Sequence, residues 1–81
     1  MIRARVTITL KPGVLDPQGK AIEGALSSLG FGGVASARQG KVIDLELDGD
    51  DTAAAEAEVT KMCEALLANT VVERYQIAIV D

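Results

Sequence analysis

Residues 2–10 read IRARVTITL and decide the first element of the fold. Apolar side chains occupy the even positions of this stretch, and arginine or threonine occupies the odd ones. Successive side chains of a β-strand point to opposite faces, so the alternation predicts a strand with one buried face. The inward set is Ile2, Ala4, Val6, Ile8 and Leu10. The following KPG ends the strand, because Pro12 cannot donate to a ladder and Gly13 permits a turn.

Residues 15–22, LDPQGKAI, predict a helix that starts at Pro17. The Asp16 side chain can accept hydrogen bonds from first-turn amides, and proline suits the first helical position. Gly30 is expected to end the helix, after an apolar stripe facing a core that consists of Ile22, Ala25, Leu26 and Leu29. The stretch carries glycines and lysines, yet it lacks the G-x-x-x-x-G-K-[ST] spacing of a phosphate loop. We therefore interpret it as the turn from a strand into a helix.

Residues 34–48 are expected to be extended. Ile43, Leu45 and Leu47 alternate with acidic residues, which predicts a half-buried strand. Gly40 marks either a hairpin turn or a bend in one long strand, and the sequence leaves both interpretations open.

A second helix is expected over roughly residues 52–68, capped by the last aspartates of the turn DGDD at 48–51. Its apolar side carries Ala55, Val59, Met62, Cys63, Leu66 and Leu67. Because Cys63 lies within this stripe, we interpret it as a buried small hydrophobe rather than a nucleophile. Asn69 is expected to close the helix in the left-handed conformation, and residues 71–80 alternate again as a last strand.

The predicted order is strand, helix, extended segment, helix and strand, in one domain that spans residues 1–81. It indicates an α+β protein of the ferredoxin-like kind, a two-layer sandwich in which two helices cover one face of a small antiparallel sheet. Opposite charges are expected to pair across the outer face, between Arg3 or Arg5 and Asp44 or Glu46. That face either meets water or serves as a protein–protein surface, and both interpretations stay open.

The composition narrows the classes of function. The chain of 81 residues has a net charge of −4, no histidine, one cysteine and two aromatic residues. It therefore lacks the basic surface and the stacking platform that nucleic-acid binding requires. An apolar run of about 18 residues, which a membrane span would need, does not occur. Without histidine or a cysteine cluster we expect no metal site and no catalytic residues, and a reduced cytoplasmic setting fits the single thiol.

Four stretches together resemble a known family: LDPQGKAI (15–22), LGF (29–31), RQGK (38–41) and MCEALLANTVVERYQI (62–77). In that order and spacing they closely resemble PurS, the family of small subunits of bacterial and archaeal phosphoribosylformylglycinamidine (FGAM) synthase. CEALLANTVVERY is the most specific part. The sequence departs from the family at the alanine-rich residues 50–58 and at Arg74, where an acidic residue is expected. These departures concern surface contacts.

The resemblance implies a non-catalytic adaptor that joins a large ATP-dependent synthetase subunit and a separate glutaminase subunit. In that complex glutamine is hydrolysed in one subunit, ammonia passes to the other, and ATP activates the formylglycinamide ribonucleotide amide for amination in purine biosynthesis. The resemblance also implies a dimer or higher oligomer. No cofactor is expected on this chain, whereas ATP and magnesium are implied for the complex.

Two other hypotheses remain. A ferredoxin-like domain of this kind often dimerises and binds an amino acid between subunits, so a small-molecule-sensing module is the main rival. A stand-alone small hydrolase is third, and the missing histidine and phosphate loop argue against it.

Six residues are candidates for contact with partners: Arg38, Gly40, Lys41, Asn69, Thr70 and Tyr75. The first three predict an exposed basic turn or bend, for which solvated charge is the alternative. Capping of a helix explains Asn69 well and Thr70 less well. Tyr75 is expected to present a polar tip from a buried ring, which is common both at interfaces and at a core edge.

Overall fold

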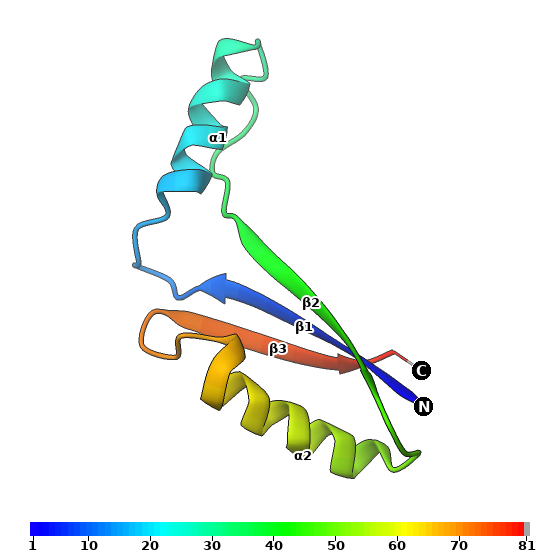
Figure 1. Cartoon of the computed structure of the whole chain (residues 1–81). Helices are drawn as coiled ribbons and strands as arrows, with labels where there is room; N and C mark the ends of the chain where they lie inside the picture. The colour runs from blue at the N-terminus through cyan, green and yellow to red at the C-terminus, as the bar shows by residue number, and fades with distance from the viewer. Residues whose placement is uncertain (81) are drawn as a thin grey trace.

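The central strand of the structure is β1 (Ile2–Leu10), which lies between β2 (Gly40–Leu47) and β3 (Glu73–Ile79). The computed structural model describes residues 1–80. Over that range the strands form a three-stranded sheet of order β2-β1-β3, and β1 is antiparallel to both neighbours (Figure 1). The predicted α+β, ferredoxin-like class with a small antiparallel sheet is confirmed.

The core lies between β1 and the second helical segment, which consists of α2 (Thr52–Met62) and a π-helical turn η1 (Cys63–Leu67). Val6, Val59 and Cys63 are completely buried there. Burial raises the pKa of the Cys63 thiol, and the Glu64 carboxylate raises it further, so the thiol stays protonated and unreactive. The predicted buried role of Cys63 is confirmed.

The π-helical turn changes which side chains face the core. In η1 the Ala68 amide donates to the Cys63 carbonyl at 3.1 Å, five residues back, which is wider than an α-helical turn. The wider turn rotates later side chains away from the stripe, and Leu66 is 83% exposed. The expected inward position of Leu66 is therefore wrong.

The helix α1 (Pro17–Ser28) does not cover the sheet in a single copy. It extends past the end of the sheet together with residues 29–39, and we call residues 11–39 the α1 arm (Figure 1). Only Gly19 is buried among the residues of α1, whereas Leu29 is 73% exposed. The Cα radius of gyration is 16.1 Å, compared with about 12 Å for a compact domain of this length. The placement of α1 over a core thus differs from the expectation.

The order of the strands explains this difference. Because β1 and β2 are antiparallel neighbours, the chain that leaves β1 must return to the same end of the sheet. The connection from β2 to β3 instead joins two parallel strands on either side of β1, so its helix α2 crosses the face of the sheet. The connection from β1 to β2 therefore leaves the sheet and returns to the same end of it. The connection from β2 to β3 crosses the sheet and covers the core.

Most predicted boundaries agree with the structure, and two need correction. Asp16 and Asp51 cap α1 and α2 through their side chains, and Gly30 has a φ of 97°. Asn69 does not adopt the left-handed conformation: within residues 1–80 a positive φ is confined to glycines. Its side-chain oxygen instead accepts a hydrogen bond from the Val71 amide at 3.2 Å, which forms a turn after the extended Ala68.

Gly40 is neither a hairpin turn nor a bend within one long strand, because β2 begins at this residue and residues 34–39 lie outside the sheet. On the outer face, Arg5 Nε lies 2.8 Å from Asp44 Oδ1. The expected cross-strand pairing of charges is confirmed for this exposed pair.

The close approach of β2 to β1 makes Gly40 sensitive to any side chain. A Cβ at this position would lie 2.5 Å from the Ile8 carbonyl oxygen and 2.8 Å from a Thr9 methyl carbon. We expect Gly40→Ala to lower the free energy of unfolding by about 1–3 kcal/mol, because the strands must separate locally. Thermal unfolding would measure this loss.

Gly24→Ala is the matched control, since nothing lies within 4 Å of a Cβ at that position in α1. It should leave the melting temperature equal or higher, because alanine favours helix over glycine by about 0.5–1 kcal/mol. Equal melting temperatures for the two variants would contradict the proposed close approach.

Candidate functional site

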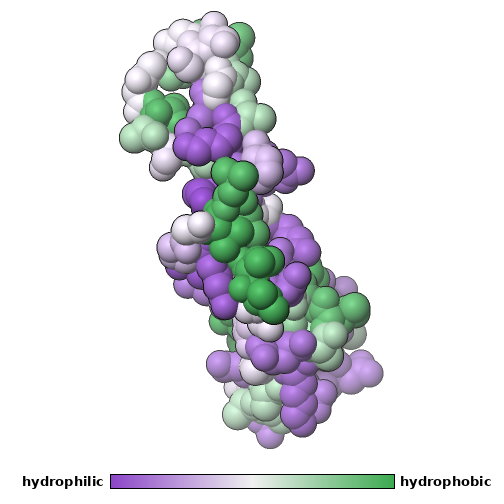
Figure 2. Space-filling view, turned by 90° about the vertical axis from the view of Figure 1, so that its left-hand side faces the viewer, coloured by the Kyte–Doolittle hydropathy of each residue, from purple (hydrophilic) through white to green (hydrophobic). Residues whose placement is uncertain are grey.

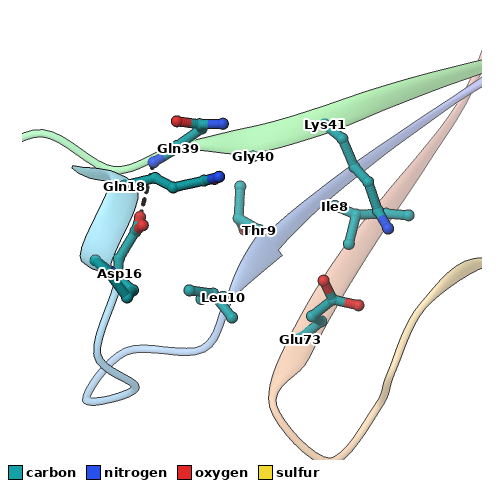
Figure 3. A pocket seen from close by; sticks show the side chains of 10 residues that line it. Ile8, Thr9, Leu10, Asp16, Gln18, Gln39, Gly40, Lys41 and Glu73 are labelled. Carbon is teal, nitrogen blue, oxygen red and sulfur yellow. Dashed lines mark hydrogen bonds between the residues drawn. The ribbon is translucent and has the colours of Figure 1, made fainter. Parts of the chain in front are cut away.

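Asp16 joins the start of α1 to the chain segment that enters β2. Its Oδ1 accepts from the Gly19 amide at 2.9 Å, and its Oδ2 accepts from the Gln39 amide at 2.8 Å (Figure 3). The residue is 5% exposed. The bond from Gln39, followed by the bond from Gly19, holds the pKa of Asp16 below its ordinary value. The carboxylate is therefore charged at neutral pH and ties together both ends of the arm.

Arg38 lies on the other side of the same junction and binds the outgoing loop. Its guanidinium donates to the carbonyl oxygens of Val14 and Lys11, each at 3.2 Å, and reaches that of Leu10 at 3.5 Å. Its Nε lies 3.9 Å from Asp16 Oδ2. The predicted basic side chain is thus engaged by the chain itself, although it remains partly exposed.

A second tie holds α1 against the returning segment further along the arm. Glu23 Oε2 accepts from the Ala37 amide at 2.8 Å, and this bond, together with nearby Lys20, lowers the pKa of Glu23. At Gly19, a Cβ would lie 2.4 Å from the Ala37 carbonyl oxygen. Glycine inside a helical pattern was the signal in the sequence for this close approach, whereas nothing in the sequence points to the bond of Glu23.

The candidates Arg38 and Lys41 do not form one basic turn. Lys41 stands opposite Ile8 in the register, so it belongs to the inner face of the sheet, whereas Arg38 binds the outgoing loop. Lys41 and Glu73 both line an open hollow of about 580 Å³ at the base of the arm (Figure 3). Gly40, between the two basic residues, approaches β1 as described above.

The remaining candidates lie at the loop before β3. Tyr75 is half-buried, and its hydroxyl donates to Glu64 Oε2 at 2.7 Å, a bond that raises the pKa of Tyr75. The polar tip of the ring is thus anchored to η1. The backbone amide of Asn69 donates to Glu73 Oε1 at 2.7 Å, and Thr70 is exposed.

The structure brings all six candidates to one end of the sheet, where β1 ends and β2 and β3 begin (Figure 1). Lys41 and Tyr75 share one cross-strand row with Ile8. The two loops at this end are joined by a bond from the Lys11 amide to the Val72 carbonyl at 2.9 Å. The end of the sheet at the base of the arm is therefore the candidate contact surface.

Two features are absent from the described part of the chain, a cluster of metal ligands and a membrane-spanning helix. Among residues 1–80, no three histidine, cysteine, aspartate or glutamate side chains gather in a way that could hold a metal ion. Over the same range no helix has the length and apolar character needed to cross a bilayer.

Comparison with known proteins gives consistent similarities over nearly the whole chain. Residues 3–81 match the family model described as PurS: Phosphoribosylformylglycinamidine (FGAM) synthase. The chain is 48% identical to the FGAM synthase subunit PurS of Synechocystis sp. over 88% of this chain and 71% of that protein. It is 40% identical to the solved PurS of Bacillus subtilis, with a TM-score of 0.89 and complete coverage of both chains.

A further similarity is to a solved structure described as PurLQS from Thermotoga maritima. A chain in the PurLQS structure from Thermotoga maritima has 33% identity and a TM-score of 0.89, over 98% of this chain and 96% of that one. The similarity to PurS inferred from four short stretches is confirmed.

The tie made by Asp16 should depend on pH. Because its pKa is lowered by folding, the carboxylate stabilises the fold above the ordinary value of 3.8, and this contribution is lost as the pH falls through the lowered pKa. Asp16→Asn should therefore lower the melting temperature most at neutral pH, and the difference from the unmodified chain should shrink below pH 3.8. Thermal unfolding at several pH values measures this.

Asp48→Asn provides a matched exposed control and should change stability by no more than about 0.5 kcal/mol. A difference between Asp16→Asn and the unmodified chain that is independent of pH would contradict the role of the Asp16 charge.

Proposed function

The chain belongs to the PurS family of FGAM synthase, and on this premise we propose that it is the adaptor of that complex. In this function it brings a glutaminase subunit and an ATP-dependent synthetase subunit together in purine biosynthesis. The observation that carries the proposal is the match of nearly the whole chain to one chain of the PurLQS structure from Thermotoga maritima.

The chemistry in this proposal belongs to the partners. The sequence has no histidine, and the thiol of Cys63 is buried with a raised pKa, so neither a general base nor an activated nucleophile stands out on this chain. The glutaminase subunit releases ammonia from glutamine. The synthetase subunit uses ATP and magnesium to activate the amide that receives the ammonia. The adaptor supplies positioning, in the cytoplasm where such biosynthesis proceeds.

Self-association follows from the exposed arm. Ile22 is 40% exposed, Phe31 is 59% exposed and Leu29 is 73% exposed, and Figure 2 shows apolar side chains on the arm at the top of the view. A helix of 12 residues is marginal in water without tertiary packing. We infer that α1 packs against a second copy, which covers the apolar stripe that one copy leaves open.

The partner surface is proposed to lie at the end of the sheet beside the arm. Lys41 and Thr70 are exposed there. Asn69 and Tyr75 belong to the same end, where they are held by hydrogen bonds to Glu73 of β3 and Glu64 of η1, respectively. This end is formed from three separate chain segments. One backbone hydrogen bond joins the loop after β1 to the loop before β3, and Arg38 joins the loop after β1 to the segment that enters β2. Because hydrogen bonds already link these segments, the surface can meet a larger subunit with little backbone rearrangement.

One observation favours the rival sensing function. Lys41 and Glu73 line the same hollow from β2 and β3, with Ile8 and Leu10 beneath them. A cation and an anion on opposite sides of an apolar floor suit the carboxylate and ammonium groups of a free amino acid. The experiment below distinguishes this function from the adaptor function.

Reconstitution with the cognate synthetase and glutaminase subunits tests the adaptor proposal. FGAM formation is followed with glutamine and, separately, with ammonia as the nitrogen donor. We expect glutamine-dependent synthesis to require this chain, whereas ammonia-dependent synthesis largely does not, because free ammonia needs no glutaminase.

If neither activity depends on the chain and no complex forms in sedimentation, the adaptor proposal fails. Amino-acid sensing then becomes the leading function. In that case glutamine should raise the melting temperature of the chain, and above its Kd the rise should continue with the logarithm of the glutamine concentration.

A further inference from the structure

We infer that Arg38 is a positioning residue, which together with Asp16 forms a latch that fixes the direction in which α1 leaves the sheet. The inference rests on the proposed function to the extent that the arm must present α1 to other subunits. The geometry of the latch itself belongs to this chain alone. It assigns Arg38 a role different from direct contact with a partner.

The latch binds the outgoing loop at several separate points. The two terminal nitrogens of Arg38 donate to the Val14 and Lys11 carbonyls, each at 3.2 Å. One of them also reaches the Leu10 carbonyl at 3.5 Å, a long hydrogen bond. The loop is folded back on itself between these points, since the Val14 amide donates to the Lys11 carbonyl at 3.1 Å. One side chain therefore holds both ends of a tight turn.

Asp16 completes the latch from the other segment. Its carboxylate accepts from the amide of Gln39, which is next to Arg38 in sequence, and from Gly19 in the first turn of α1. Arg38 thus reaches from the returning segment to the outgoing loop, and Asp16 reaches back from the helix start to the returning segment. Two crossed connections of this kind resist both rotation and bending of the arm.

Packing does not perform this task in a single copy. Gly19 is the buried position of α1. Because it has no side chain, its backbone can lie against the backbone of Ala37. Glu23 adds one hydrogen bond to the Ala37 amide further out. With no apolar core between arm and sheet, polar ties at the base carry the orientation.

The chemistry of the side chain explains why arginine serves here. A guanidinium presents several donors in a rigid planar fork, so one residue can satisfy carbonyls that lie apart. An ammonium group is a compact point charge and cannot span the same acceptors. Lysine at position 38 would keep the charge near Asp16 and lose the hold on the loop.

Amide hydrogen exchange of the whole chain tests the latch directly. In Arg38→Ala and in Arg38→Lys, exchange at Gly19, Ala37 and Gln39 should accelerate by about tenfold or more. The arm loses the bonds from Arg38 to the outgoing loop, so it should open more often and break the bonds of these amides to Asp16 and Glu23. The control Lys41→Ala should leave these three amides unchanged. The amide of Val6, in the central strand, reports whether the sheet remains folded.

Activity in the reconstituted complex supplies the second measurement. Both Arg38 variants should lose glutamine-dependent synthesis and keep ammonia-dependent synthesis, because the arm is misdirected while the synthetase is untouched. If Arg38 instead contacted a partner through its charge, Arg38→Lys would restore glutamine-dependent synthesis, and exchange in the free chain would not change.

The possible outcomes separate the latch from the proposed function. Unchanged exchange at the three amides in Arg38→Ala overturns the latch, whatever the complex does. Accelerated exchange in Arg38→Ala, combined with an unmodified chain that forms no complex, supports the latch and defeats the adaptor proposal. If Arg38→Ala also exposes Val6, Asp16→Asn replaces it, since it weakens the other half of the latch and should accelerate exchange at Gln39.

Discussion

The carboxylate of Asp16 is the constraint on which the arrangement of the arm depends. It is the place where the chain that leaves the sheet and the chain that returns to it share hydrogen bonds. A buried carboxylate is costly unless it is bound by donors, and here two backbone amides supply them while the Arg38 guanidinium provides a positive charge 3.9 Å away. The same bonds that cap α1 therefore also fix where α1 points.

The topology divides the molecule into two parts with different sources of stability. The sheet and α2 share an apolar core around Val59 and Cys63, because the crossover from β2 to β3 lays a helix on one face. The α1 arm returns to its own end of the sheet and has no such core. In the proposed assembly its apolar residues gain stability by packing on a second copy.

The sequence could predict which residues alternate and where helices begin. The alternation in residues 2–10, the caps at Asp16 and Asp51 and the burial of Cys63 all depend on neighbouring positions, and all agree with the structure. An apolar stripe on α1 was equally visible. Periodicity shows that a helix face is apolar, yet it does not show whether the same chain or another one covers that face.

The candidate site was predicted only in part, for a similar reason. Arg38 and Lys41 are near in sequence, but the start of β2 between them sends their side chains to different places. The bonds from Arg38 to carbonyls of the outgoing loop join residues more than twenty positions apart, and backbone acceptors leave no mark in a sequence. Asn69 suits either a left-handed helix end or a side-chain turn, and the π-helical turn before it decides for the second.

The most direct test of this account is amide hydrogen exchange of the unmodified chain at decreasing protein concentration. We expect Leu26 and Leu29 in the arm to lose protection on dilution, as second copies dissociate, while Val6 in the central strand keeps its protection. If the amides of α1 remain equally protected where only single copies are present, then the arm is stable by itself. That result would contradict the claim that it needs another molecule to cover it.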